Sequence, residues 1–172
     1  MKAIPFSCAL LVGSFPALAG PEAGAILGYS LMSASSGADP QGGLMLGARG
    51  GFRTDTGTVL DAQFLRNSSS SAGLSTTETV VGLGVRYFIV EAALSPLVAG
   101  HLNYHMGASA GTSQGTDEIP NSSGIGVDLG GGLQIRMSDL LYTDIIAQYA
   151  IQMTGDARHN TLGFGVGFGV TF

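Results

Sequence analysis

The chain has 172 residues, of which 45% are hydrophobic and 11% charged, with 28 glycines, no tryptophan and a formal net charge of −5. This length fits one domain, and the excess of acidic over basic residues argues against a nucleic-acid-binding surface. So little charge is unusual for a surface in water, yet the chain contains no uninterrupted apolar run of about 18 residues, which excludes a transmembrane helix.

The N-terminal segment has the features of a secretory signal peptide. A positive charge near the start is followed by a mostly apolar run from Ile4 to Val12 and by the small-x-small sequence Ala17-Leu18-Ala19. We therefore expect a signal peptide at residues 1–19 and one mature domain at residues 20–172. The single cysteine, Cys8, lies within the signal, so the mature chain has no disulfide.

Beyond residue 20 large apolar residues alternate with polar residues and glycines, the period-two pattern of β-strands. We expect eight strands, at about residues 23–34, 42–53, 58–66, 77–88, 96–108, 123–137, 141–153 and 161–172. Their composition predicts loops at 35–41, 67–76, 107–122 and 154–160, and short turns at 54–57 and 138–140. The segment 89–95 has the weakest pattern and is interpreted as a turn flanked by strand ends.

The last segment shows the alternation most clearly. Leu162, Phe164, Val166, Phe168, Val170 and Phe172 alternate with four glycines and Thr171. Such a strand is prone to aggregation in water but suits the wall of a membrane barrel, with its apolar face toward lipid. The pattern also resembles the signal by which bacterial outer-membrane assembly machinery recognises β-barrels, which we assign to Phe164, Phe168, Val170 and Phe172.

The spacing of the strands indicates a closed barrel. Segments of about 9 to 15 residues are long enough to cross a membrane at a barrel's tilt. Short turns alternate with longer polar loops, and bacterial barrels place short turns in the periplasm, so we expect both termini there. An even number of strands lets the first pair with the last, which leaves no edge. Candidates for the aromatic girdles are Tyr29, Tyr87, Tyr104, Tyr142, Tyr149 and Phe172.

The chain resembles the small eight-stranded outer-membrane barrels of the OmpA-domain and OmpX kind, also called opacity-like or porin-like proteins. The resemblance rests on Ala17–Ala19, the segment Pro96–Tyr104 with Gly100 inside it, Gly130–Gly132 before Leu133, and Gly163–Phe172. It implies an all-β, antiparallel transmembrane barrel in the outer membrane of a Gram-negative bacterium. It further implies a monomer that contacts membrane lipid and lipopolysaccharide and is inserted by the barrel-assembly machinery. Because the sequence ends at Phe172, we expect no peptidoglycan-binding domain after the barrel.

Charged residues on the strands are expected to face the lumen, because an arginine facing lipid near the midplane costs about 2–4 kcal/mol. The expected set comprises Arg49, Arg53, Asp61, Glu78, Arg86, Asp128, Arg136 and Asp144. Arg53 and Asp61 flank one short turn, and Arg136 and Asp144 flank another, so each pair is predicted to meet across its hairpin. The set favours a salt-bridge network filling a structural surface barrel; a narrow, passive, porin-like channel is the alternative.

The sequence predicts no catalytic, cofactor or metal site. His101 and His105 share a strand face but lie about 13 Å apart along it, too far to ligate one metal. A serine hydrolase needs its nucleophile beside its base, and no His-x-Ser pair occurs on any expected strand. We therefore expect a protein that is not an enzyme.

A secreted, soluble, lipocalin-like binding barrel is a further alternative. Such a protein also has a signal, strands and turns, and it buries its apolar face around a ligand. The glycine-rich and thinly charged polar face, together with the terminal Phe172, favours the membrane barrel.

Overall fold

The computed structural model describes residues 20–34, 40–71, 74–111, 123–153 and 159–172. The predicted signal peptide lies outside these residues. Among the described residues, the structure contains no helix with the length and hydrophobicity that spanning a membrane requires.

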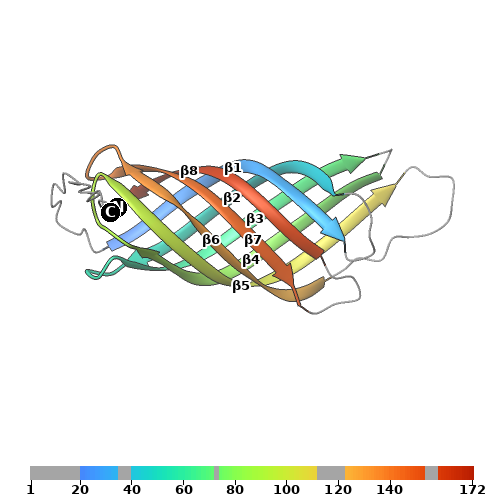
Figure 1. The fold of residues 1–172 in the computed structure, drawn as a ribbon, viewed down its shortest axis with the longest axis horizontal. Helices are drawn as coiled ribbons and strands as arrows, with labels where there is room; N and C mark the ends of the chain where they lie inside the picture. The colour runs from blue at the N-terminus through green and yellow to red at the C-terminus, as the bar shows by residue number, and fades with distance from the viewer. Residues whose placement is uncertain (1–19, 35–39, 72–73, 112–122, 154–158) are drawn as a thin grey trace, which may run out of the picture.

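The structure is a closed, all-antiparallel barrel of eight strands (Figure 1). The strands are β1 (Gly20–Ala34), β2 (Gln41–Arg53), β3 (Thr58–Ser71), β4 (Leu74–Phe88), β5 (Leu94–Gly111), β6 (Ser123–Arg136), β7 (Leu141–Gln152) and β8 (His159–Thr171). Each strand pairs with its neighbours in sequence, and β1 also pairs with β8. Every strand thus has two partners, and no open edge is left to face lipid or another chain.

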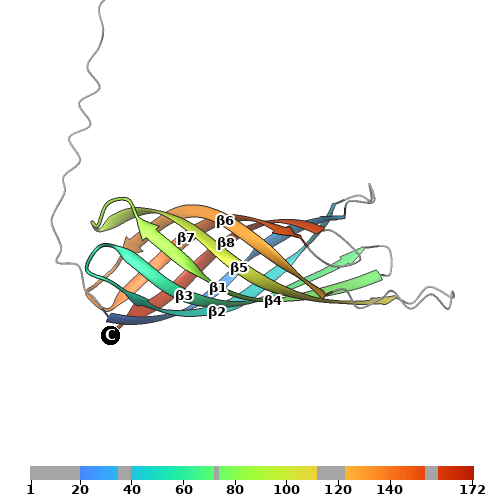
Figure 2. The same ribbon diagram turned by 90° about the horizontal axis from the view of Figure 1, so that it is seen from below.

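The strands are strongly tilted to the barrel axis, as both views show (Figures 1 and 2). Residues that pair directly on neighbouring strands form a row around the barrel. The row starts at Tyr87 on β4 and returns to β4 at Thr77, after crossing β5, β6, β7, β8, β1, β2 and β3. The row therefore climbs ten residues, from Tyr87 to Thr77, in one circuit. Strand tilt and this stagger together set the width of the lumen, and eight strands leave only enough room for side chains.

Short turns gather at the end of the barrel where β1 begins and β8 ends (Figure 1). They join β2 to β3, β4 to β5 and β6 to β7. In the first of them Gly57 has a φ of 74°, a conformation that glycine adopts without steric cost. The Thr54 amide donates to the carbonyl of Thr58 at 2.8 Å and closes this turn.

The predicted number, order and approximate position of the strands are confirmed. The predicted loop at 67–76 is wrong over most of its length, because β3 continues to Ser71 and β4 begins at Leu74. Its serine-rich composition indicated a loop, but Asn67 pairs with Glu78 and Ser69 with Thr76. Pairing with a neighbouring strand here outweighs the local preference of serine for turns. β5 likewise extends beyond the predicted strand, from Leu94 to Gly111.

The exterior is apolar and the interior polar. Leu129 and Leu83 on the outside are 70% and 69% exposed, whereas Asp128 and Asp144 inside are 2% and 0% exposed. This arrangement is the reverse of a soluble barrel, which would bury its apolar face. The lipocalin-like alternative is therefore inconsistent with the structure.

Tyr142 is a further correction. The sequence placed it among candidates for the aromatic girdles, but it lies inside the barrel and is 2% exposed. It occupies the same inward-facing parity of β7 as Asp144, and its hydroxyl contacts Glu22 at 3.5 Å. Tyr29, Tyr87, Tyr104 and Tyr149 face outward.

Candidate functional site

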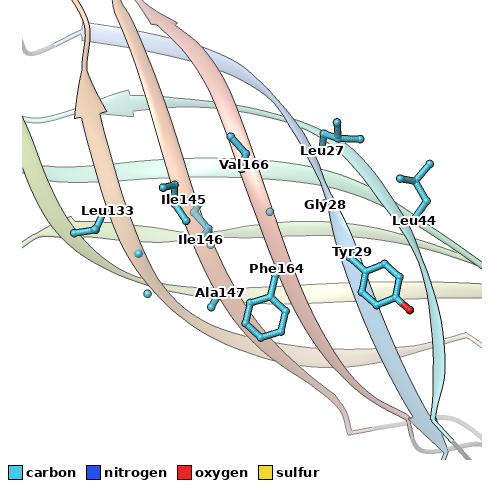
Figure 3. A pocket seen from close by; sticks show the side chains of 13 residues that line it. Leu27, Gly28, Tyr29, Leu44, Leu133, Ile145, Ile146, Ala147, Phe164 and Val166 are labelled. Atoms are coloured by element: carbon cyan, nitrogen blue, oxygen red, sulfur yellow. The ribbon is translucent and has the colours of Figure 1, made fainter.

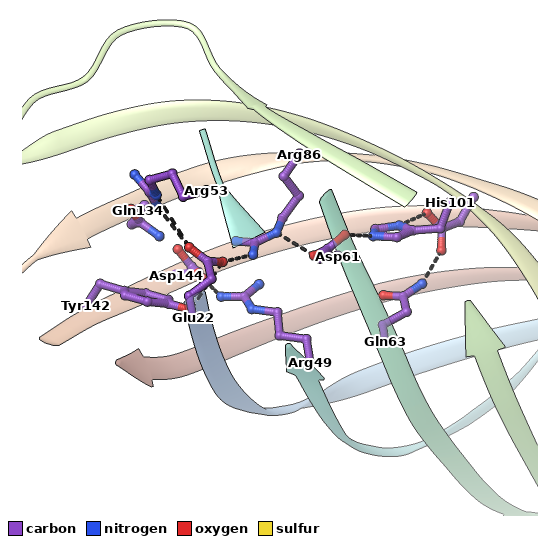
Figure 4. A network of polar contacts seen from close by, with 11 residues as sticks. Glu22, Arg49, Arg53, Asp61, Gln63, Arg86, His101, Gln134, Tyr142 and Asp144 are labelled. Atoms are coloured by element: carbon purple, nitrogen blue, oxygen red, sulfur yellow. Dashed lines mark hydrogen bonds and ion pairs between the residues drawn. The ribbon is translucent and has the colours of Figure 1, made fainter. Parts of the chain in front are cut away.

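The candidate site is the polar network inside the lumen, and Glu22 is its centre (Figure 4). Glu22 on β1 is 3% exposed and accepts from Arg53 Nε at 3.4 Å and Nη2 at 3.3 Å. Its second oxygen forms an ion pair with Arg86 of β4 and accepts from the Tyr142 hydroxyl. One carboxylate near the β1 end of the barrel therefore joins side chains from three other strands.

From Arg86 the network continues along the lumen. Arg86 Nε donates to Asp61 Oδ2 at 2.6 Å. The other oxygen of Asp61 lies 3.0 Å from His101 Nε2, and His101 Nδ1 lies 2.7 Å from Asp128 Oδ1. The His101 ring thus bridges two buried carboxylates, one from β3 and one from β6.

Two amide side chains donate further hydrogen bonds to Asp128. Its Oδ2 accepts from Gln63 Nε2 at 2.6 Å and from Asn103 Nδ2 at 2.8 Å. The amides also contact each other at 3.3 Å. Asp128 is consequently held by three side chains from β3 and β5, as a buried carboxylate needs in order to remain stable.

Two arginines near the end of the barrel where β1 begins make further contacts. Arg49 forms an ion pair with Asp144 and lies 5.7 Å from the ring centroid of Tyr142. Arg53 donates to Gln134 Oε1 at 2.8 Å and stacks 4.1 Å from the ring centroid of Phe88. A cation over an aromatic face gains electrostatic attraction that is strongest when water is excluded.

A separate polar cluster lies nearer the opposite end of the barrel. Glu78 on β4 contacts His105 Nδ1 at 2.8 Å and accepts from Asn67 Nδ2 at 3.0 Å. Leu65 lies between Gln63 and Asn67 on the inward face of β3. It pairs with Val80 of β4. Leu65 and Val80 pack with Ile26 and Met45 in an apolar layer that separates the two polar clusters.

A cavity in the lumen beside the main network is very small. The cavity lined by Arg49, Asp61, Gln63, Arg86, His101 and Asp128 has a volume of about 10 Å³. That is about the least that can hold a single water molecule. A second apolar cluster of Val59, Phe88 and Leu97 fills the interior near the turn end.

Glycines on intervening strands make room for these side chains. Gly51 pairs with Asp61, and Gly84 lies between Asp61 and His101 in the same register row. A Cβ at Gly84 would collide with the His101 ring, and one at Gly82 would collide with Asn103 Oδ1. The large polar side chains therefore extend into space that the glycines of neighbouring strands leave free.

The structure places every member of the predicted lumenal set on inward-facing positions. Arg49, Arg53, Asp61, Glu78, Arg86, Asp128 and Asp144 are buried, and Arg136 is half-buried at the end of β6. Of the predicted assembly signal, Phe164, Phe168 and Phe172 are exposed on the outside, and Val170 is half-buried.

The predicted partners are wrong. Asp61 pairs in register with Gly51 rather than with Arg53, and Asp144 with Gln134 rather than with Arg136. Asp61 instead pairs with Arg86 of the neighbouring strand β4, and Arg53 with Glu22 of the neighbouring strand β1. Asp144 pairs with Arg49 across the lumen. Contacts across the lumen depend on the width of the closed barrel, which a local pattern does not contain.

Glu22 was missed because it follows Pro21 and precedes the expected start of the first strand. A signal was present, since Glu22 shares the parity of Gly28 and Ser30 and so continues the inward face of β1. His101 and His105 contact different carboxylates, in keeping with their separation along β5. Within the described residues no group of three or more His, Cys, Asp or Glu suits a metal ion.

Solved outer-membrane barrels share this fold. Neisserial surface protein A aligns with a TM-score of 0.76 at 15% identity, over 89% of this chain and 97% of that chain. OprG from Pseudomonas aeruginosa aligns with a TM-score of 0.61 at 12% identity, over 90% and 96%. Ail, the attachment invasion locus protein of Yersinia pestis, aligns with a TM-score of 0.55 at 17% identity, over 88% and 99%.

No family model and no curated protein sequence matches the chain. The structural likeness shows that the chain has the fold of the small eight-stranded outer-membrane barrels. This fold and the apolar exterior indicate the cell outer membrane as its location.

Removing the central carboxylate should destabilise the barrel strongly. Glu22→Ala leaves Arg53 and Arg86 buried without this partner, and breaking a buried pair costs about 3–5 kcal/mol. The free energy of unfolding, from urea titration of the barrel in liposomes, measures the loss. The control Asp139→Ala, in the exposed β6–β7 turn, should change it by less than about 0.5 kcal/mol. Equal effects of the two substitutions would contradict a structural role for Glu22.

The glycine at position 82 should be coupled to Asn103. Gly82→Ala should cost about 1–3 kcal/mol, because the added methyl group collides with Asn103 Oδ1 and lies 3.1 Å from Gln63 Cγ. In an Asn103→Ala background the same substitution should cost clearly less, as a double-mutant cycle of unfolding free energies will show. An unchanged cost would mean that the glycine does not accommodate the amide.

Proposed function

We propose that this protein is a structural surface barrel of the outer membrane whose lumen is closed to solutes by its own side chains. The observation that carries the proposal is the succession of buried side-chain clusters along the lumen in the part of the chain that the structure describes. The charged network around Glu22, the apolar layer of Leu65 and Val80, and the cluster around Glu78 follow one another along the barrel. A permeating ion would have to separate buried ion pairs and then cross an apolar layer, and each step carries a large desolvation cost.

The orientation we propose follows from the connections between strands. Short turns lie at the end where β1 begins, and bacterial barrels place short turns in the periplasm. The opposite end, with the β3–β4 hairpin and the Glu78 cluster, then faces the cell exterior. The outward-facing aromatic residues of β8, including Phe164 and Phe168, are the segment we propose for recognition by the barrel-assembly machinery.

We also propose that the protein is not an enzyme. His105 has an Nε2 without a hydrogen-bond partner, but the residue is 3% exposed inside the barrel and therefore out of reach of a substrate outside it. The other inward-facing histidine of β5, His101, contacts carboxylates through both of its ring nitrogens. The ring therefore has no free nitrogen to take a proton from a nucleophile. Its role in the structure is to connect Asp61 with Asp128.

Conductance across planar bilayers tests the proposal. The protein is first shown to be folded by its altered gel migration before and after boiling. Folded protein should then give no unitary conductance steps, because a permeating ion would have to separate the buried ion pairs and cross the apolar layer.

Reproducible steps from the folded protein would contradict the closed lumen and favour the narrow-channel alternative. Leu65→Ala, which trims the apolar layer, is the matched control for contaminating porins. Steps that arise in this lumen would change in size with Leu65→Ala, whereas those of a contaminant would not.

A further inference from the structure

The outer wall of the barrel carries an apolar groove of about 600 Å³ (Figure 3). It crosses five strands, β6, β7, β8, β1 and β2. Adjacent strands are about 4.8 Å apart, so the groove spans about 19 Å. Its length and apolar lining suit a fatty-acyl chain better than a polar ligand.

Two rows of outward-facing residues form the walls of the groove. One row runs through Leu133, Ile145, Val166 and Leu27, and the other through Gly131, Ala147, Phe164, Tyr29 and Leu44. Between the rows the inward-facing positions Gly132, Gly165 and Gly28 present only backbone to the outside. The small residues Gly131 and Ala147 widen the groove, since their neighbours on the same face are large.

The same two rows continue onto β3, where their chemistry changes. Leu27 pairs with Leu46 and Leu46 with Arg66, while Leu44 pairs with Ser68. Arg66 is exposed and is the one charged side chain on the outward face of the strands in the part of the chain that the structure describes. The row through Leu27 therefore leads from the groove to a cation on β3, one strand beyond the last residue that lines the groove.

Arg66 lies at the boundary between the apolar belt and a polar rim. Phe64 precedes it on the outward face of β3, and Ser68 follows it. Thr79, its partner on β4, is also polar. An outward arginine costs about 0–1 kcal/mol near the interface, far less than at the midplane, so this position is consistent with the headgroup level.

We propose that Arg66 and the groove form a binding site for lipid A, with a lipid A phosphate on the Arg66 guanidinium and one acyl chain in the groove. This inference rests on the orientation proposed above, which places Arg66 in the outer leaflet. The phosphorylated lipid of that leaflet in Gram-negative bacteria is lipid A. Guanidinium forms strong, paired hydrogen bonds with phosphate, and the acyl chain removes the groove from contact with disordered lipid.

Native mass spectrometry of the folded barrel in detergent tests the site by titration with diphosphorylated lipid A. The wild-type protein should retain one lipid A. Arg66→Gln should weaken binding about tenfold or more, as expected for loss of a charge-assisted hydrogen bond, and Arg66→Lys should recover part of it.

The groove is tested separately by Gly131→Leu, which fills it. A Cβ at Gly131 meets only the Leu97 carbonyl oxygen, at 3.5 Å, so the backbone accommodates a side chain. Gly50→Leu is the matched control, because Gly50 is also outward-facing, lies outside the groove, and its Cβ would meet only the Glu22 carbonyl oxygen, at 3.7 Å. Gly131→Leu should weaken lipid A binding and Gly50→Leu should not.

Three results would overturn the site: no retention of lipid A by wild-type protein, equal retention by all variants, or equal retention of phosphatidylglycerol. Gel migration and bilayer conductance of the same samples separate this inference from the proposed function. A folded, non-conducting barrel without lipid A overturns the lipid site alone, whereas conductance by the folded barrel overturns the closed lumen alone.

Discussion

The rest of the structure depends on where charge can be placed in a narrow barrel that crosses a membrane. An outward arginine near the midplane costs about 2–4 kcal/mol, so most charged side chains of the strands must point inward. An eight-stranded barrel has room inside for little more than side chains, so those charges are also removed from bulk water. They are stable there only when each has a close partner of opposite charge or a hydrogen-bonding group. Glu22, with two arginines and a tyrosine around it, meets this requirement most fully.

Glycines on the inward face make room for these large side chains. Arg86, His101 and Asn103 extend across the lumen, and they fit because glycines occupy neighbouring inward positions such as Gly82 and Gly84. On the outside, glycine has a different effect. Gly131 leaves a groove in the wall, and the register leads that groove to Arg66. The same residue type therefore contributes both to closure of the lumen and to the shape of the lipid-facing surface.

Much of the fold was predictable because a strand's period of two is a local property of the sequence. Alternation placed Leu83, Leu129 and Phe164 on the outside and Asp61 and Asp128 on the inside. Strand ends were less predictable where composition and pairing disagree, as in the serine-rich end of β3.

The partners of the charged residues were not predictable in the same way. Arg49 meets Asp144, and Arg86 meets Glu22, across the lumen rather than across a hairpin. Such contacts depend on the register of all eight strands and on the width of the closed barrel, neither of which a local pattern contains. Tyr142 shows the same limit, since an aromatic residue near a strand end suits either an interface or the interior.

The central claim is that the apolar face is outside and the charged face inside. The chain has no tryptophan, so single-tryptophan variants report on each face without background. Phe64, 48% exposed on β3, and Phe88, 2% exposed inside the turn end, are suitable sites. In vesicles of brominated lipid, the fluorescence of Phe64→Trp should be strongly quenched and that of Phe88→Trp largely preserved. Strong quenching of Phe88→Trp with preserved fluorescence of Phe64→Trp would contradict the assigned faces.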